Sequence, residues 1–219
     1  MIVLALDTAG VDCAAAVYDS GSDTMLGEAS DMIGKGHAEH LMGIVDRVLA
    51  QAGKKLAMVE RIAVTIGPGS FTGIRVGVAA ARGFALALNI PTVGITTLET
   101  MAAAQRVKTP GRAVLAAMDA KRGEIYLQSF SAEGEPLDDP RAVTIEEAQA
   151  FASTFDGEIT GSAAPLLRPE LTGDYANSFP ISFVARLGAA ADPSSGKPKP
   201  LYLRGPDAKP QAGFAIARV

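Results

Sequence analysis

Apolar residues follow two different periods along the chain, and these periods separate extended from helical segments. Short apolar runs at residues 2–8, 13–19 and 24–30 are divided by turn residues, a pattern that predicts three strands in a meander. In residues 37–53 the apolar side chains recur at steps of three and four, which predicts an amphipathic helix that ends at Gly53. These apolar positions are Leu41, Ile44, Val45, Val48 and Leu49.

The rest of the first half alternates between the same two patterns. We expect a buried strand at 61–67, a helix at 70–89, a strand at 91–95 and a helix at 96–106. A meander followed by alternating helices and strands predicts a mixed sheet with helices on its faces. The predicted order of the first half is therefore βββαβαβα.

The pattern restarts after a composition break at residues 106–112. Residues 113–130 repeat the order found at 2–19: an apolar strand, an aspartate, a tight turn and a second strand, with Asp119 in the place of Asp7. Weak internal similarity of this kind indicates two related α/β halves.

We therefore divide the chain into two lobes, residues 1–107 and residues 108–219. The second lobe is expected to be a shortened copy, with a helix at 144–154, a strand at 157–164 and a short helix at 181–190.

Composition narrows the class of protein. The chain has 219 residues, 48% of them hydrophobic, and a mean hydropathy of +0.20, which allows a sizeable core. The net charge of −4 and pI of about 5.2 provide no overall basic field for nucleic acid. A single cysteine, Cys13, excludes an intramolecular disulfide and fits a reducing cytosol. The first residues lack the basic start of a signal peptide, and Arg75 and Arg82 interrupt the most apolar helix, so we expect a cytoplasmic protein without a membrane span.

The segment TIGPGSFTGIR, residues 65–75, has the composition of a phosphate-binding loop. Gly67, Gly69 and Gly73 are spaced one residue wider than the dinucleotide fingerprint, and no Lys-Ser/Thr pair follows as in a Walker loop. Free backbone N–H groups at a strand-to-helix junction would still suit an anion. The alternative, which the residues favour, is a plain turn in which Ser70 caps the following helix.

Asp7 and Thr8 follow the first strand and form a second candidate for phosphate chemistry. An aspartate in this place can position a metal-bound phosphate, as in ATPases of the actin/hexokinase type. The alternative is a turn residue that caps its own backbone. The repeat at Asp119 is followed by Ala120 rather than by a hydroxyl residue, so the second loop has fewer donors for phosphate.

The sequence contains no constellation for metal or nucleophilic catalysis that can be named. His37 and His40 are the only histidines, and with Glu39 nearby they are too few to complete a zinc site; a helix-surface or interface role is favoured. Ser70 has no identifiable base, and GPGSF is not the nucleophile motif G-x-S-x-G.

The helix at 70–89 carries two stripes of small residues. One stripe is Gly73, Gly77 and Ala81, and the other is Ala79, Gly83 and Ala87. Because interior glycines cost a helix roughly 1 kcal/mol each, they indicate close backbone approach. One stripe can face the sheet, and the second then indicates a partner surface; a helix wholly buried in its own domain is the alternative.

Basic residues gather near the end of the chain. They are Lys197, Lys199, Arg204, Lys209 and Arg218. Such residues can contact RNA phosphates, but a solvated tail is the favoured interpretation.

These segments together resemble the bacterial TsaB (YeaZ) family. The resemblance runs through LALDTA, HAEHLMGIVDRVL, TIGPGSFTGIRVGVAAARGFA and IPTVGITTLE, and resumes at MDAKRGEIYLQSF and PLYLR. It implies the two-lobed actin/hexokinase-type (ASKHA) fold. It also implies a role in forming threonylcarbamoyladenosine in tRNA, as a non-catalytic scaffold and activator subunit of the transferase complex.

The resemblance further implies partners. TsaB pairs with its paralogue TsaD, which transfers the threonylcarbamoyl group, and works with the ATPase TsaE; tRNA is met only through the complex. Without TsaD a homodimer is expected. No cofactor is expected to bind tightly, although ATP or ADP can lie at the interface with TsaD.

A comparison with TsaD supports the non-catalytic role. TsaD-type relatives carry two metal-binding histidines just after the strand that here is residues 91–95, and Thr97 and Met101 stand at those positions. Neither side chain replaces an imidazole as a metal ligand. The loop residues Asp7, Thr8, Gly67, Gly69 and Ser70 are then a vestigial phosphate loop.

The resemblance places the partner surface on the first two helices. The expected contact residues are His37, Leu41, Ile44, Val45, Val48, Ile74, Gly77, Val78, Ala81 and Arg82. Two alternatives from other classes are a metal-dependent peptidase-like enzyme and a small-molecule kinase of the same fold.

Overall fold

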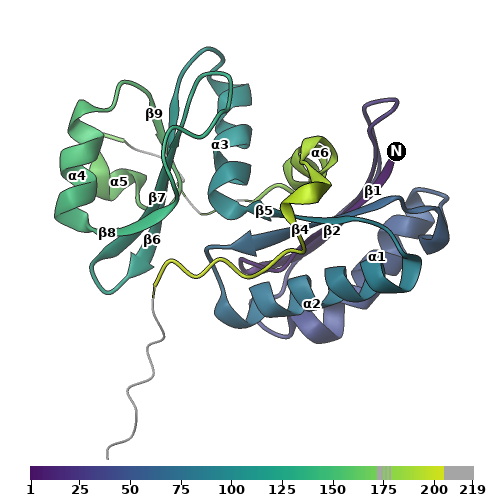
Figure 1. The fold of residues 1–219 in the computed structure, drawn as a ribbon. Helices are drawn as coiled ribbons and strands as arrows, with labels where there is room; N and C mark the ends of the chain where they lie inside the picture. The colour runs from purple at the N-terminus through teal and green to yellow at the C-terminus, as the bar shows by residue number, and fades with distance from the viewer. Residues whose placement is uncertain (172–174, 176, 178, 205–219) are drawn as a thin grey trace, which may run out of the picture.

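The computed structural model describes residues 1–171, 175, 177 and 179–204, which form two β-sheets and the helices around them (Figure 1). The five-stranded sheet has the order β3-β2-β1-β4-β5 and the four-stranded sheet the order β8-β7-β6-β9. The strands are β1 (Ile2–Asp7), β2 (Asp12–Asp19), β3 (Thr24–Met32), β4 (Arg61–Gly67), β5 (Thr92–Thr96), β6 (Val114–Lys121), β7 (Glu124–Phe130), β8 (Arg141–Thr144) and β9 (Glu158–Thr160). The helices are α1 (His37–Gln51), α2 (Phe71–Leu88), α3 (Thr97–Lys108), α4 (Ile145–Thr154), α5 (Ala164–Leu167) and α6 (Ile181–Ala190), with 3₁₀ turns η1 (Leu56–Met58) and η2 (Pro193–Ser195).

The predicted meander and mixed sheet are confirmed. Strands β1, β2 and β3 pair antiparallel, whereas β4 pairs parallel with both β1 and β5. The parallel strands are joined by helices α1 and α2, which cover the same face of the sheet (Figure 1). This arrangement brings the ends of β1 and β4 side by side, where the two candidate loops begin.

The predicted internal repeat is also confirmed. The order β8-β7-β6-β9 reproduces β3-β2-β1-β4, and in each copy a helix precedes the last strand, α4 in one and α1 in the other. Helix α4 begins with a capping box between Thr144 and Glu147. The expected strand at 157–164 is shorter than predicted, because β9 ends at Thr160 and the single turn of α5 follows.

Two helices pack on the sheet formed by the other half of the chain. Helix α6 lies on the five-stranded sheet, where Val184 and Ala185 pack with Val3 and Ala5. Helix α3, from the first half, packs against β6 of the four-stranded sheet. The two sheets therefore do follow the cut in the sequence, but each sheet is covered by a helix from the other half (Figure 1).

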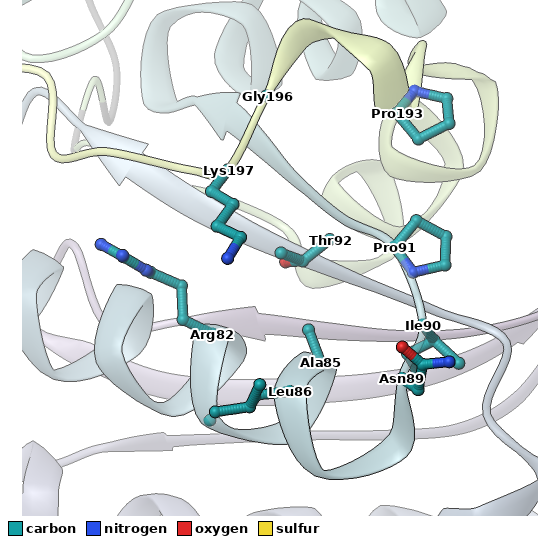
Figure 2. Close-up of a pocket in the computed structure, with 11 residues that line it drawn as sticks. Arg82, Ala85, Leu86, Asn89, Ile90, Pro91, Thr92, Pro193, Gly196 and Lys197 are labelled. Carbon is teal, nitrogen blue, oxygen red and sulfur yellow. The ribbon is translucent and has the colours of Figure 1, made fainter.

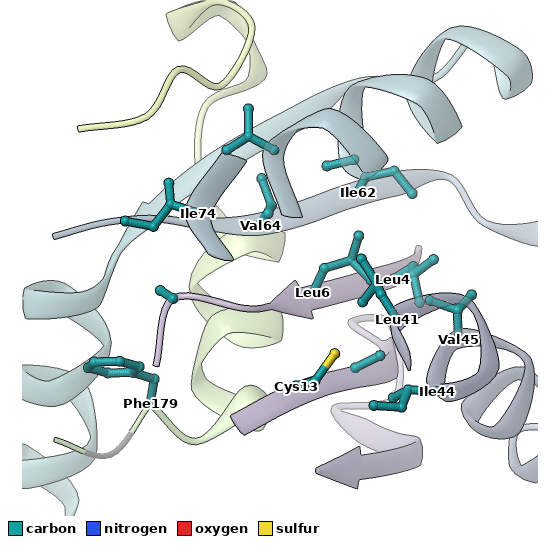
Figure 3. Packing of buried hydrophobic residues seen from close by; sticks show 14 of the residues in the cluster. Leu4, Leu6, Cys13, Leu41, Ile44, Val45, Ile62, Val64, Ile74 and Phe179 are labelled. Atoms are coloured by element: carbon teal, nitrogen blue, oxygen red, sulfur yellow. The ribbon is translucent and has the colours of Figure 1, made fainter. Parts of the chain in front are cut away.

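The apolar faces of α1 and α2 point into the molecule and pack on the five-stranded sheet (Figure 3). Nine of the ten residues expected to contact a partner are buried there: His37, Leu41, Ile44, Val45, Val48, Ile74, Gly77, Val78 and Ala81. The choice of face was therefore wrong for these nine, because the hydrophobic stripe covers the chain's own sheet. Only Arg82 is exposed.

Helix α2 is long and apolar enough to cross a membrane by length and composition, with a mean hydropathy of 1.3 over its 18 residues. Its two arginines, Arg75 and Arg82, are within the number of charges that this test allows. Core helices of soluble proteins pass the same test; in this helix 28% of the window is buried, and α2 packs against β4 and β1.

Candidate functional site

The glycine loop after β4 docks directly onto the turn after β1. The backbone N–H of Ser70 donates to the carbonyl oxygen of Ala9 at 2.7 Å. A Cβ atom on Gly73 would lie 1.9 Å from the carbonyl oxygen of Thr8, and one on Gly69 would lie 2.4 Å from that of Ala9. The spacing of the glycines is therefore explained by two backbone segments in contact.

Polar side chains at this junction bond to one another. The Thr8 hydroxyl donates to the Gly73 carbonyl at 2.7 Å, and the Gly73 N–H donates to the Ser70 hydroxyl at 3.2 Å. One carboxylate oxygen of Asp7 accepts from the Ala9 N–H at 2.9 Å and from the Thr65 hydroxyl at 2.5 Å. Ser70 is the N-cap of α2, as predicted.

Asp7 is a buried acid. Removal from water raises its pKa from 3.8 to about 6, and the hydrogen bonds from Thr65 and Ala9 oppose that rise only in part. The side chain is 1% exposed, so the carboxyl group has little contact with solvent. Its bonds hold the turn after β1 in place.

The structure thus brings together the five residues predicted as a vestigial phosphate loop: Asp7, Thr8, Gly67, Gly69 and Ser70. The donors that would serve a phosphate, the Thr8 hydroxyl and the Ser70 N–H, are already bonded within the chain. The arrangement supports the reading as a structural turn, because an anion would have to break these bonds.

Thr97 and Met101, the positions that the resemblance relates to the metal ligands of TsaD, both carry buried side chains. The Thr97 hydroxyl donates to the carbonyl oxygen of Pro68 at 2.6 Å, which ties α3 to the glycine loop. Met101 is buried in the main core cluster. His37 is buried with its Nε2 atom 3.1 Å from the Asp12 carbonyl oxygen, and His40 is exposed. Among the described residues, no three His, Cys, Asp or Glu side chains converge on one point.

The outward sides of α1 and α2 form a second feature, which we call the outer helix face. Its residues are Met42 and Gly43 on α1 and Ala79, Gly83, Leu86 and Ala87 on α2, all exposed. Leu86 is 82% exposed and Met42 44%. A Cβ atom built on Gly43 or Gly83 meets nothing within 4 Å, so neither glycine is required by the packing of this chain.

The sequence pattern predicts the α2 half of this face but not the α1 half. The stripe Ala79, Gly83 and Ala87 was recognised from its small residues, and the structure leaves it open. Met42 and Gly43 were not singled out, because they lie one and two residues after Leu41, on the polar side of the helical period.

A segment near the end of the described chain joins the two lobes, and the sequence analysis gave it no role. The Leu201 N–H donates to the carbonyl oxygen of Ile66, and Arg204 bonds to Glu124 on β7. Tyr202 accepts a hydrogen bond from Arg75 on α2 at 2.7 Å. We call residues 198–204 the bridging segment. The sequence feature that could have identified it is the pair of apolar residues Leu201 and Leu203 inside an otherwise basic tail.

Comparisons with known proteins agree with this architecture. The family model described as "TsaD: tRNA N6-adenosine threonylcarbamoyltransferase" matches residues 30–164. The tRNA threonylcarbamoyladenosine biosynthesis protein TsaB of Escherichia coli (strain K12) is 34% identical over 205 residues, which cover 93% of this chain and 79% of that protein. The chain belongs to the TsaB family. The protein of the same name from Haemophilus influenzae is also 34% identical, over 61% of this chain and 55% of its own length.

Solved structures of this family have the same fold. A Pseudomonas aeruginosa protein with similarity to peptidase YEAZ superposes with a TM-score of 0.77 and 25% identity, and covers 93% of this chain and 99% of its own. A second structure, YeaZ from Pseudomonas aeruginosa, gives a TM-score of 0.76 at 25% identity, with 92% of this chain and 99% of that one covered. The predicted α/β fold, in which a second half repeats the strand order of the first, is confirmed.

Proposed function

We propose that this chain is a non-catalytic scaffold and activator subunit of the complex that makes threonylcarbamoyladenosine in tRNA. It pairs with a TsaD subunit and works with TsaE, and it meets tRNA only through that complex. Membership of the TsaB family supports the pathway, because the named relatives are tRNA threonylcarbamoyladenosine biosynthesis proteins.

One observation carries the non-catalytic part of the proposal. The loop that would bind a phosphate in an active relative is closed by bonds within the chain, between Thr8 and Gly73 and between Ser70 and Ala9. A loop whose donors are satisfied gains little from a phosphate, since each new bond replaces an existing one. The kinase alternative would require these groups to be free.

The partner surface is proposed to be the outer helix face. Small residues allow another helix pair to approach closely, and Met42 and Leu86 supply apolar area that water does not favour. A second TsaB chain would use the same face, so the proposed homodimer and the pair with TsaD exclude each other. No cofactor binds tightly in this proposal; if ATP or ADP takes part, it lies at the interface with TsaD.

Reconstitution tests the proposal. TsaD, TsaE, the enzyme that makes threonylcarbamoyl-adenylate, ATP, threonine, bicarbonate and tRNA are combined with or without this chain. We expect modified tRNA only when the chain is present, and we expect the chain alone to leave ATP and tRNA unchanged. Full activity without the chain, or ATP hydrolysis by the chain alone, would contradict the proposal.

A further inference from the structure

A pocket of about 500 Å³ opens beside the C-terminal end of α2, away from the glycine loop (Figure 2). It lies between that end of α2, the start of β5 and residues 193–197. Pockets of roughly 300–1,000 Å³ suit small molecules. The volume therefore fits a compact ligand and does not require a macromolecule.

The lining of this pocket carries positive charge without a matching carboxylate. Arg82 and Lys197 both line it, and no Asp or Glu is among its described lining residues. Figure 2 shows Lys197 extending from its segment toward α2 and Arg82 extending from α2 toward that segment. Within the described part of the chain, neither side chain has an ion-pair partner.

A buried hydroxyl group on β5 is left without a partner in the same place. Thr92 is 8% exposed and lines the pocket, and among the described residues its Oγ1 atom has no hydrogen-bond partner. Buried polar groups are nearly always paired, because an unpaired one loses its bonds to water without replacement. An acceptor atom of a ligand in the pocket would satisfy this donor.

We propose that this pocket binds the phosphate group of a small molecule. Arg82 offers a planar guanidinium that can make two parallel bonds to phosphate oxygens, and Lys197 adds a point charge. The Thr92 hydroxyl donates the third type of bond. An RNA backbone is the less suitable occupant, because the chain's net charge of −4 opposes binding over a larger surface. The pocket shares Gly83 and Leu86 with the outer helix face, but its test uses this chain alone, so the proposal does not depend on the proposed function.

Calorimetry with inorganic pyrophosphate and with ADP tests the site. The variants are the double substitution Arg82→Gln with Lys197→Gln, and a control pair, Lys55→Gln with Lys108→Gln, which removes the same charge from exposed positions outside the pocket. We expect at least one probe to bind the native chain, and the pocket double variant to bind it about tenfold more weakly or not at all. The control pair should bind as the native chain does.

Thr92→Val supplies a test in which stability and binding move in opposite directions. Removing an unpaired buried hydroxyl should raise the melting temperature of the free protein, whereas loss of the donor should weaken binding of the same probe. A misfolded variant would have a lower melting temperature as well as weaker binding. A higher melting temperature together with weaker binding is therefore specific to the proposed role of Thr92.

Three results would overturn the proposal. The first is that neither pyrophosphate nor ADP binds. The second is equal weakening by the control pair, which would assign any binding to general charge. The third is binding of a single-stranded oligouridylate, but of neither small probe, that is lost in the pocket double variant. That third result would show that Arg82 and Lys197 contact a nucleic acid and not a small phosphate compound.

Discussion

At the scale of single residues, Asp7 holds a turn in place but buries a carboxyl group that would ionise more readily in water. Its carboxyl group fixes the turn after β1 through Ala9 and Thr65, yet burial opposes its ionised form. An aspartate after a strand was visible in the sequence. Its partner Thr65 lies 58 residues away on β4, so the bond could only be recognised once the two strands were paired.

We predict that Asp7 makes the protein less stable as the pH rises. Its folded-state pKa of about 6 lies above the ordinary value of 3.8, so the folded chain holds an extra proton between these values. The stabilisation is fully present below pH 3.8 and is lost as the pH rises through about 6, by about 3 kcal/mol in total. Denaturant unfolding of the native chain and of Asp7→Asn across this range measures it.

The comparison with Asp7→Asn isolates the effect of this one carboxyl group, because every other titratable group is present in both the native chain and the variant. The unfolding free energy of the variant should rise relative to the native chain as the pH increases. A difference that stays constant with pH would show that Asp7 titrates normally in the folded protein.

Two glycines of α2 should respond in opposite ways to the same substitution. Gly73→Ala places a Cβ atom against the Thr8 carbonyl, and we expect a loss of about 3 kcal/mol in unfolding free energy. Gly83→Ala meets no atom, and we expect a gain of about 1 kcal/mol from helix propensity. Thermal and denaturant unfolding measure both. Similar losses at both positions would contradict the assignment of inner and outer faces.

At the scale of elements, α2 shows what a sequence can and cannot determine. The sequence predicts two separate stripes of small residues on this helix, and the structure buries Gly73, Gly77 and Ala81 and leaves Ala79, Gly83 and Ala87 exposed. Which stripe faces outward could not be predicted, because apolar residues surround the helix and its period fixes only relative angles. The predicted contact residues Ile44 and Val78 proved to be core residues, because the buried side of each helix covers the chain's own sheet.

The sequence could not predict that α3 and α6 each pack on the sheet of the other half, for a related reason. Both helices have apolar faces, but an amphipathic pattern does not say which of two sheets the face will cover. Val184 and Ala185 suit either sheet by composition. The chain order placed α6 in the second lobe, and only tertiary packing moved it to the first.

The outer helix face makes a prediction about pairing that is separate from folding. Gly83→Glu replaces a helix-interior glycine with a better helix former, so the free chain should be at least as stable. A charge in the centre of the face should nevertheless abolish co-purification with TsaD. Ala150→Glu, an exposed position on α4, is the matched control and should pair normally. Normal pairing by Gly83→Glu would rule out this face.

At the scale of the whole molecule, the bridging segment links the two lobes. The Tyr202 ring lies beside Phe71, with ring centroids 5.4 Å apart and the planes tilted by 36°, and Arg75 lies over the Phe71 ring. These contacts hold the first turn of α2 to the bridging segment. The same segment reaches the second lobe through Arg204, which bonds to Glu124 on β7. The start of α2 is therefore connected to both sheets.

We predict that Tyr202→Ala loosens this connection while the two cores persist. The Leu201 amide, which donates to Ile66, should exchange its hydrogen faster, whereas amides within β1 should be unaffected. Hydrogen-exchange mass spectrometry measures both, with Leu137→Ala as a control at another exposed apolar side chain. Unchanged exchange at Leu201 would show that the segment is held by its backbone alone.

The central claim is that the chain acts through its outer helix face and not through its glycine loop. The most direct test is formation of threonylcarbamoyladenosine in the reconstituted system with three versions of this chain: native, Ser70→Ala and Gly83→Glu. Ser70→Ala removes a cap and a hydroxyl from the loop, and we expect it to support modification at the native rate. Gly83→Glu should support none while remaining folded. Loss of activity in Ser70→Ala with retained activity in Gly83→Glu would contradict the account.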